Sequence, residues 1–167
     1  MSFKKIDTDS LSGNVFREIG EEWMLVSAER NGVVNTMTAS WGGMGVLWKE
    51  NVAFVFIRPQ RYTYEFTENS EYMTLSFFGG EYKKELSYLG THSGRDEDKV
   101  AAVNFHHTKV DGHPTFEEAE RVFVCRKLYS DMIKEECFID TSMLSCYEKK
   151  DYHRVYVVKV ETVYTKE

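Results

Sequence analysis

Runs of apolar and β-branched residues, separated by turn-forming pairs, dominate the chain and predict a mostly β protein. Residues 24–28 and 35–41 flank Arg30-Asn31-Gly32, and an Asn-Gly pair adopts the positive φ angles of a tight hairpin turn. Residues 52–57 are apolar at every position, which predicts a central strand covered on both faces. Residues 72–78 predict a further strand.

Short helices are predicted between these strands. Residues 62–69 form a short helical segment after a proline, and residues 81–89 carry apolar side chains at helical spacing. Gly90 is placed to cap the second helix at its C-terminus. Residues 96–103 begin with acidic side chains, which a helix N-terminus favours, and predict a third helix after the loop 91–96.

The last third of the chain alternates between turns and extended stretches. Asp111-Gly112 and His113-Pro114 predict turns, and residues 121–129, 137–140 and 154–164 predict extended segments. The last stretch places every second residue on one face, as a strand requires. The residues of that face are Tyr156, Val158, Val160, Thr162 and Tyr164.

Many antiparallel strands with short helices confined to the middle predict a mainly β (α+β) barrel, because regular βαβ alternation is absent. No linker or repeat divides the chain, so residues 1–167 are expected to form a single domain. The glycine-rich segment 42–45 lacks the GxGxxG spacing of a dinucleotide-binding turn and is expected to be a flexible loop.

Composition and charge narrow the possible functions. Apolar residues make up 42% of the chain and aromatic residues 14%, which is typical of a globular protein. The net charge of −6 offers no broad positive field to a nucleic acid, so that partner is not expected. No apolar run reaches the ~20 residues that cross a bilayer, and residues 1–7 lack the apolar core of a signal peptide. The sequence therefore predicts a cytoplasmic protein without a membrane partner.

Three cysteines, Cys125, Cys137 and Cys146, are too widely spaced for a CxxC pair and are interpreted as reduced thiols. A reactive cysteine remains an alternative, although no concentrated positive charge lies near any of them in the sequence. His106 and His107 are adjacent and would face opposite sides of a strand, so no metal site is predicted.

The candidate chemistry lies in two segments. The first is a strand of small and β-branched residues, with short donors suited to the edge of a flat polar ring. The second contains Arg58, Arg61 and Thr63, and guanidinium groups bind phosphate through a planar fork of donors. Together they indicate a phosphorylated, ring-bearing ligand. The alternatives are an ordinary barrel strand with Trp41 in the core and arginines on a solvated face. The residues of the first segment are Asn35, Thr36, Met37, Thr38, Ala39, Ser40 and Trp41.

With these motifs in order, the chain resembles the flavin reductase-like proteins, which have an FMN-binding split β-barrel, and in particular their flavoredoxin branch. The resemblance runs from about Trp23 to Val160. It rests on four motifs: Asn35-x-Met37-Thr38-Ala39-Ser40-Trp41, Arg58-Pro59-x-Arg61-Tyr62-Thr63, Ser93-Gly94-Arg95-Asp96-x-x-Lys99 and Asp151-x-His153.

This resemblance implies a six-stranded antiparallel split β-barrel with short peripheral helices, a homodimer, and one FMN per subunit. By position, residues 35–41 would line the isoalloxazine and ribityl chain, with backbone groups of this strand at the polar edge of the ring. Arg58, Arg61 and Thr63 would hold the phosphate. Ser76 would touch the cofactor. Lys99 would lie near the flavin and favour its anionic reduced form, with a surface charge as the alternative.

The resulting hypothesis is an FMN-binding oxidoreductase that takes electrons from NAD(P)H or a protein donor and delivers them to free flavin or another acceptor. The alternative is a flavoredoxin-like electron-transfer protein with little NAD(P)H reductase activity of its own. A plain FMN-binding module is a third possibility. No catalytic acid or base is predicted, because the flavin supplies the chemistry.

Overall fold

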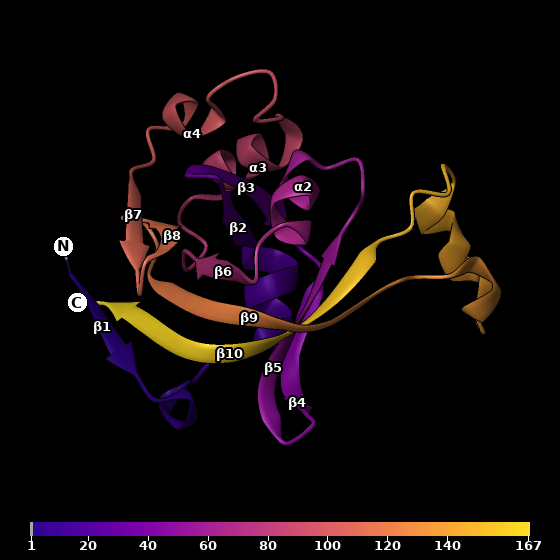
Figure 1. The fold of residues 1–167 in the computed structure, drawn as a ribbon, viewed down its shortest axis with the longest axis horizontal. Helices are drawn as coiled ribbons and strands as arrows, with labels where there is room; N and C mark the ends of the chain where they lie inside the picture. Colours follow the sequence, from indigo (N-terminus) through magenta and orange to yellow (C-terminus); the bar gives the residue numbers. More distant parts are fainter. Residues whose placement is uncertain (1) are drawn as a thin grey trace.

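A computed structural model describes residues 2–167, and its main feature is an eight-stranded antiparallel sheet that coils around a hydrophobic core (Figure 1). A separate two-stranded sheet, β7 (His107–Val110) with β8 (His113–Phe116), lies beside it. The strands of the large sheet are β1 (Phe3–Ile6), β2 (Met24–Arg30), β3 (Val33–Ala39), β4 (Gly42–Leu47), β5 (Glu50–Ile57), β6 (Tyr72–Phe77), β9 (Arg121–Met132) and β10 (Arg154–Lys166).

The helices are short and connect the strands. They are α1 (Val15–Arg17), which continues into a π-helical turn (Glu18–Glu22), α2 (Tyr62–Glu68), α3 (Lys83–Thr91) and α4 (Lys99–Ala102). The three predicted helices are thus present as α2, α3 and α4, and the last is shorter than its acidic start suggests. The chain also contains 3₁₀ segments at Thr8–Ser10, Glu135–Cys137 and Thr141–Tyr147.

The strand order β3-β2-β6-β9-β10-β5-β4 leaves the barrel split. β3 and β4 lie at the two ends of this order and, within residues 2–167, do not pair with each other, although they are neighbours in the sequence. The predicted fold class, mainly β with short peripheral helices, is confirmed. The sheet has eight strands rather than six because β1 pairs with β10 and the glycine-rich segment forms β4.

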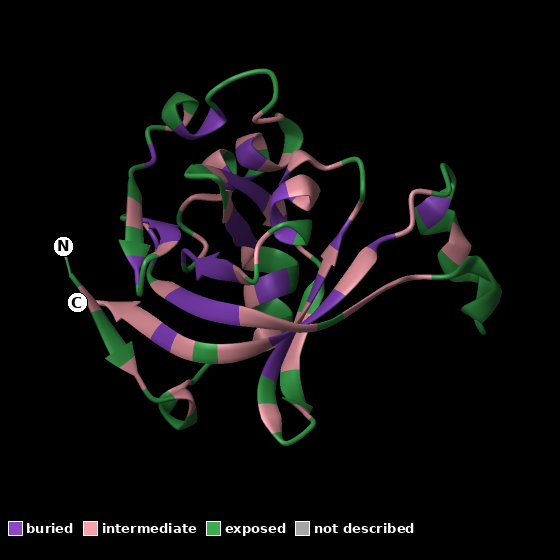
Figure 2. Cartoon of the chain, in the orientation of Figure 1, coloured by how far each residue is buried: buried purple, intermediate pink, exposed green. Residues whose placement is uncertain are grey.

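Two hydrophobic cores stabilise the sheet from its two faces. β2 shows the pattern: Met24 and Val26 enter the core inside the barrel, whereas Leu25 enters the outer core formed with α3, α4 and the small sheet. Figure 2 shows the resulting band of buried residues along the strands and under the helices. Each fully buried aliphatic or aromatic side chain contributes about 1.5–3 kcal/mol through burial, so packing on both faces holds the strands in register.

Contacts between distant segments correct several local predictions. Gly90 lies inside α3 rather than capping it, and a Cβ at this position would lie 3.1 Å from the Cβ of Thr38. The glycine therefore lets α3 pack closely on β3. Residues 42–45 belong to a strand, not a loop, because β4 pairs with β5 from Gly42↔Val55 to Leu47↔Glu50.

Two predictions in the last third are also wrong. His113 and Pro114 begin strand β8, and only Asp111-Gly112 forms the turn. The predicted strand 137–140 lies instead in an arm, residues 133–153, that leaves the barrel after β9 and returns at β10 (Figure 1). In this arm two 3₁₀ segments replace sheet pairing.

β10 is a strand as predicted, but its alternation is interrupted. Its pairing with β9 shifts register between Val157 and Val158 and again between Val160 and Thr162. As a result Val163 enters the inner core, and the predicted single face does not persist along the strand. Across residues 2–167 we find no helix with both the length and the apolar character needed to cross a bilayer.

Candidate functional site

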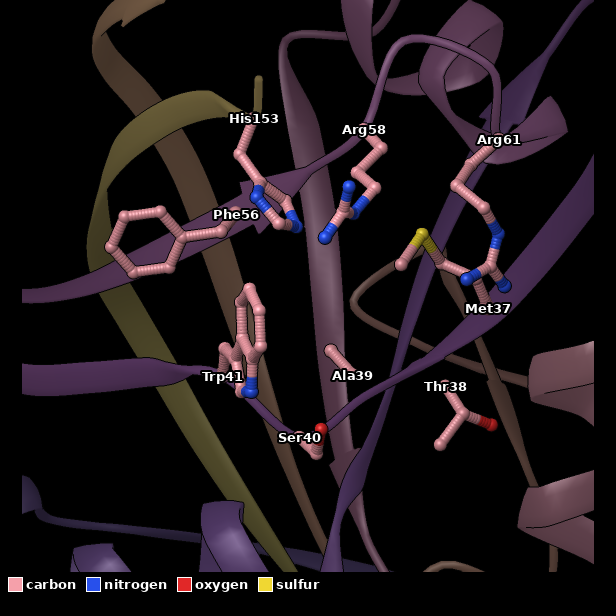
Figure 3. Close-up of a pocket in the computed structure, with 9 residues that line it drawn as sticks. All are labelled: Met37, Thr38, Ala39, Ser40, Trp41, Phe56, Arg58, Arg61 and His153. Carbon is pink, nitrogen blue, oxygen red and sulfur yellow. The ribbon is translucent and has the colours of Figure 1, made fainter. Parts of the chain in front are cut away.

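A groove runs along β3. It consists of two adjoining pockets of about 190 Å³ and 240 Å³ that share Arg61. Figure 3 shows the first pocket, with arginine guanidinium groups and aromatic rings around one opening. That pocket is lined by Met37, Thr38, Ala39, Ser40, Trp41, Phe56, Arg58, Arg61 and His153. The second is lined by Asn35, Gln60, Arg61, Tyr62, Thr63, Gly90, Thr91, His92, Ser93 and Lys99.

Asn35 connects β3 to two of the other motifs. Its Nδ2 donates to Oγ1 of Thr63 at 2.8 Å, and both side chains are buried. A Cβ on Gly94 would lie 2.3 Å from Oδ1 of Asn35, so only glycine lets this loop approach so closely. Arg95 of the same loop forms an ion pair with Glu65 of α2. The loop, β3 and α2 are thereby held together.

Lys99 and Arg61 place two positive charges at this end of the groove, which we call the cationic end. Lys99 is 4% exposed, and its Nζ donates to the carbonyl oxygens of Leu89 at 2.7 Å and His92 at 3.0 Å. Burial, and then repulsion from Arg61, lower the pKa of Lys99 to about 8, while Glu97 partly offsets this. Burial also lowers the pKa of Arg61.

The cationic end has the chemistry of an anion site. No carboxylate within residues 2–167 lines its pocket or forms an ion pair with Arg61 or Lys99. Because the oxygen of Thr63 already accepts from Asn35, its hydroxyl hydrogen can donate into the pocket. A guanidinium, an ammonium and a hydroxyl together match the oxygen atoms of a phosphate.

Arg58, a predicted phosphate ligand, has protein partners of its own. Its Nη1 lies 2.5 Å from Oδ2 of Asp151, and its Nη2 donates to the carbonyl oxygen of Cys146 at 3.0 Å. The guanidinium also lies over the ring of Tyr147, 5.1 Å from its centroid. Arg58 therefore lines the groove and also ties the arm to the end of β5, whereas Arg61 forms no ion pair in the described chain.

Aromatic rings form the other end of the groove, which we call the ring end. The ring centroids of Trp41 and His153 lie 5.2 Å apart, and Phe56 packs on His153 edge to face at 6.4 Å. Nδ1 of His153 lies 2.8 Å from the hydroxyl oxygen of Tyr147. Burial, and then the charge of Arg58, lower the pKa of His153 to about 4, so this ring is neutral near pH 7. The ring end thus offers flat surfaces with little charge.

Phe56 and His153 are additions to the predicted site residues. Phe56 belongs to an apolar run that predicts only a buried strand, and nothing local marks its side chain as lining a groove. His153 does carry a signal, because it belongs to the Asp151-x-His153 motif, but that motif alone assigns it no role.

The alternation of β3 divides the predicted segment. Asn35, Met37 and Ala39 line the groove, whereas Thr36 is fully buried elsewhere, and its hydroxyl donates to the carbonyl oxygen of Val26. Thr38 lies at the edge of the first pocket in Figure 3, and its hydroxyl donates to α3. The side chain of Thr36 therefore lies away from the groove, and the contact that the resemblance implies for this residue would have to come from its backbone.

Ser76 also lies away from the groove. It is fully buried in β6, and its Oγ lies 2.9 Å from Oγ1 of Thr115 on β8. Strand pairing places it between Leu25 and Val122, which both belong to the outer core. The strand presents the side chain of Ser76 to the small sheet, so the predicted contact with the cofactor has no support in this geometry.

Comparisons with known proteins identify the family and the fold. The family model described as the flavin reductase like domain matches residues 16–167. No protein of curated function matches the sequence.

Solved structures share the fold. An FMN-binding domain of a flavin reductases-like enzyme from Shewanella baltica superposes with a TM-score of 0.69 at 16% identity, over 98% of this chain and 77% of that one. An FMN-binding protein from Thermus thermophilus, with bound p-hydroxybenzaldehyde, gives 0.65 at 26% identity, over 87% and 71%. Flavoredoxin of Desulfovibrio vulgaris gives 0.67 at 19% identity, over 87% and 69%.

Proposed function

The chain belongs to the flavin reductase-like family, and we propose that it is an FMN-binding oxidoreductase that passes electrons from NAD(P)H or a protein donor to free flavin or another acceptor. One observation carries the proposal. Four motifs that are far apart in the sequence meet around one groove, which has a cationic end and an aromatic end. A phosphorylated molecule with a flat ring system fits that combination.

The residues present fit FMN in both charge and shape. Arg61, Lys99 and Thr63 would hold the phosphate, because they supply two positive charges and a hydroxyl in a pocket without carboxylates. For Lys99 this replaces the place beside the flavin ring that the resemblance implies, since it lines the same pocket as Arg61 and Thr63. Met37 and Ala39 of β3 would contact the ring system, and Trp41 would cover its outer edge. When bound, FMN supplies the redox chemistry, since its ring accepts a hydride and passes electrons on singly or in pairs.

The protein's part in the reaction is to bind, orient and exclude water. His153 is neutral near pH 7 and fixed by Tyr147, so it forms a rigid, uncharged wall beside the ring end. A donor held in contact with the ring at this wall gains rate from proximity and orientation. No side chain is assigned the role of a catalytic acid or base.

Two further features belong to the proposal. In line with the resemblance, we propose a homodimer, which sedimentation of the purified protein would test. We also propose a cytoplasmic location, since the thiols of Cys137 and Cys146 are exposed and unpaired in the described structure and suit a reducing compartment.

The test is a visible absorption spectrum of the freshly purified protein, followed by release of any chromophore and its identification by mass. Stoichiometric FMN would support the proposal. A colourless protein that also fails to bind added FMN would refute it.

Steady-state NAD(P)H oxidation, with and without added free flavin, then identifies the donor and acceptor. Turnover with NAD(P)H supports the reductase. Reduction only by a protein donor would instead favour an electron carrier of the flavoredoxin kind.

A further inference from the structure

A second groove adjoins the ring end. It has a volume of about 510 Å³ and lies between α1 with its π-helical turn and the beginning of β4. Ser40, Trp41 and Phe56 line both this groove and the first pocket, so the two spaces meet at the ring end. We call it the apolar groove.

The apolar groove differs from the first groove in charge. Its walls include Phe16, Ile19 and Met44, and no charged side chain within residues 2–167 lines it. Phe16 is 85% exposed and Trp41 is 47% exposed, so large apolar surfaces face the opening. Contiguous exposed apolar surface on a protein usually marks an interaction surface or a ligand site.

Charged side chains near the apolar groove form ion pairs. Arg17 pairs with Glu22 at 2.8 Å, and Arg121 pairs with Glu18 at 3.0 Å. These pairs neutralise Arg17, Glu18 and Glu22 of the helical wall. A ligand that carries phosphate would therefore find no unpaired cation lining the described part of this groove.

Glycines keep the apolar groove open. A Cβ on Gly42 would lie 3.0 Å from the carbonyl oxygen of Phe54, so that glycine is needed for close packing. Gly20 and Gly43 are different: a Cβ on Gly20 meets nothing within 4 Å, and one on Gly43 meets only a ring atom of Phe54 at 3.7 Å. Packing does not demand glycine at either position, so their missing side chains leave volume that a ligand can occupy.

We propose that the apolar groove is the acceptor subsite and that it takes an uncharged, flat, apolar molecule of the quinone class. This inference rests on the proposed function, because it places the acceptor against the ring end of the FMN groove. The volume lies within the ~300–1,000 Å³ of small-molecule sites. NAD(P)H carries a pyrophosphate, which needs cations that this groove lacks.

The reaction balances with the donor already named. NAD(P)H gives up a hydride and a proton is taken from water, and the quinone gains both as it becomes a hydroquinone. Trp41 and Phe56 supply the surfaces on which a flat quinone can lie in contact with the ring end. No other oxidant or reductant is required.

Two substitutions, one in each wall, would reduce the volume of the apolar groove. Gly43→Val adds a side chain to β4, and Gly20→Leu adds one to the helical wall. Gly45→Val is the matched control, because it lies on the same strand, has nothing within 4 Å of its Cβ and does not line the groove. The probe is 2-methyl-1,4-naphthoquinone, and its affinity is measured by calorimetry on protein with and without FMN.

We expect Gly43→Val and Gly20→Leu each to weaken naphthoquinone binding by about tenfold, because a filled pocket discriminates by that factor or more per added group. The KM for naphthoquinone should rise in parallel, whereas FMN affinity and the rate with ferricyanide, a charged acceptor, stay within about twofold. Gly45→Val should match the unaltered protein in every measurement.

Three results would overturn the proposal. The first is naphthoquinone binding that neither groove variant changes. The second is that the groove variants bind NAD(P)H more weakly but bind naphthoquinone as the unaltered protein does. The third is a dimer that becomes a monomer in Gly43→Val while naphthoquinone never binds, which would show that a second copy covers the groove. If the protein binds no FMN, the proposed function fails, yet calorimetry without FMN still tests whether this groove binds the quinone.

Discussion

The pH dependence of FMN binding tests the cationic end directly. The pKa of Lys99 is about 8, because burial removes water from its ammonium and Arg61 repels it. A bound phosphate would stabilise the charged form, so its pKa rises in the complex. Below pH 8 the lysine is already mostly charged and binding takes up little proton. Above pH 8 binding takes up a proton, and affinity falls as pH rises.

The size of the effect follows from the pKa of the free site. At pH 9, one unit above it, about one lysine in ten carries its charge before FMN binds. The apparent Kd should therefore rise about tenfold between pH 7 and pH 9, which corresponds to about 1.4 kcal/mol. The phosphate itself contributes little, because its second pKa is near 6 and it is mostly a dianion throughout.

Quenching of FMN fluorescence at constant ionic strength, at pH 7, 8 and 9, gives the three Kd values. Lys99→Arg is the control, since a guanidinium stays charged over this range and its Kd should not change with pH. Riboflavin, which lacks the phosphate, should show a weaker dependence. Equal slopes for FMN and riboflavin, or for the protein and its Lys99→Arg variant, would refute the assignment.

Single contacts support three further tests. Arg61→Ala should weaken FMN binding by about 1.5–3 kcal/mol and leave riboflavin affinity unchanged. Arg58→Ala should lower the Tm with little effect on FMN affinity. Equal losses of FMN affinity in the two variants, measured by equilibrium dialysis, would contradict these different roles for the two arginines. Gly94→Ala should weaken FMN binding in calorimetry, since its Cβ would displace Asn35 from Thr63, while Gly45→Ala should show no change. A thiol reagent should label the exposed cysteines of the folded protein but not Cys125, because Cys125 is buried and its pKa is raised by burial. Rapid reaction of all three thiols in the folded protein would show that the reagent reaches the core.

Much of the barrel could be predicted from the sequence because its elements depend on local signals. The Asn31-Gly32 turn positions the β2–β3 hairpin, and the apolar run at 52–57 forms most of β5, between β4 and β10. Gly90 could not be predicted in the same way. Its role depends on a contact with Thr38, which lies far away in the sequence, and a C-terminal cap is the usual reason for a glycine near a helix end.

The arm and the glycine-rich segment show the same limit. Residues 137–140 have the composition of a strand, yet they lie where no neighbouring strand in the described chain pairs with them. Residues 42–45 have the composition of a loop, yet β5 offers a partner edge and they pair with it. Pairing partners, rather than propensity, determine both outcomes.

Site residues could be predicted where their position depends only on the strand or helix that carries their motif. Asn35, Thr63 and Lys99 are such residues, and all three line the groove. The arginine motif alone assigns Arg58 to phosphate, because its partner Asp151 lies far away in the sequence and cannot be inferred from spacing. The side chain of Thr36 lies away from the groove for a simpler reason, since strand alternation already separates it from Asn35.

The pairing of Arg58 has a consequence for how a ligand lies in the groove. Both arginines line the first pocket, and if both were unpaired a phosphate could bind at either end. Asp151 neutralises Arg58 beside the ring end, so the positive field is confined to Arg61 and Lys99. We therefore propose that this charge distribution sets the direction of a phosphorylated ligand, with its ring toward Trp41. Asp151→Asn frees the charge of Arg58, so calorimetry with inorganic phosphate should show a second, weaker binding event in that variant. A single unchanged event would mean that Asp151 does not set the direction of the ligand.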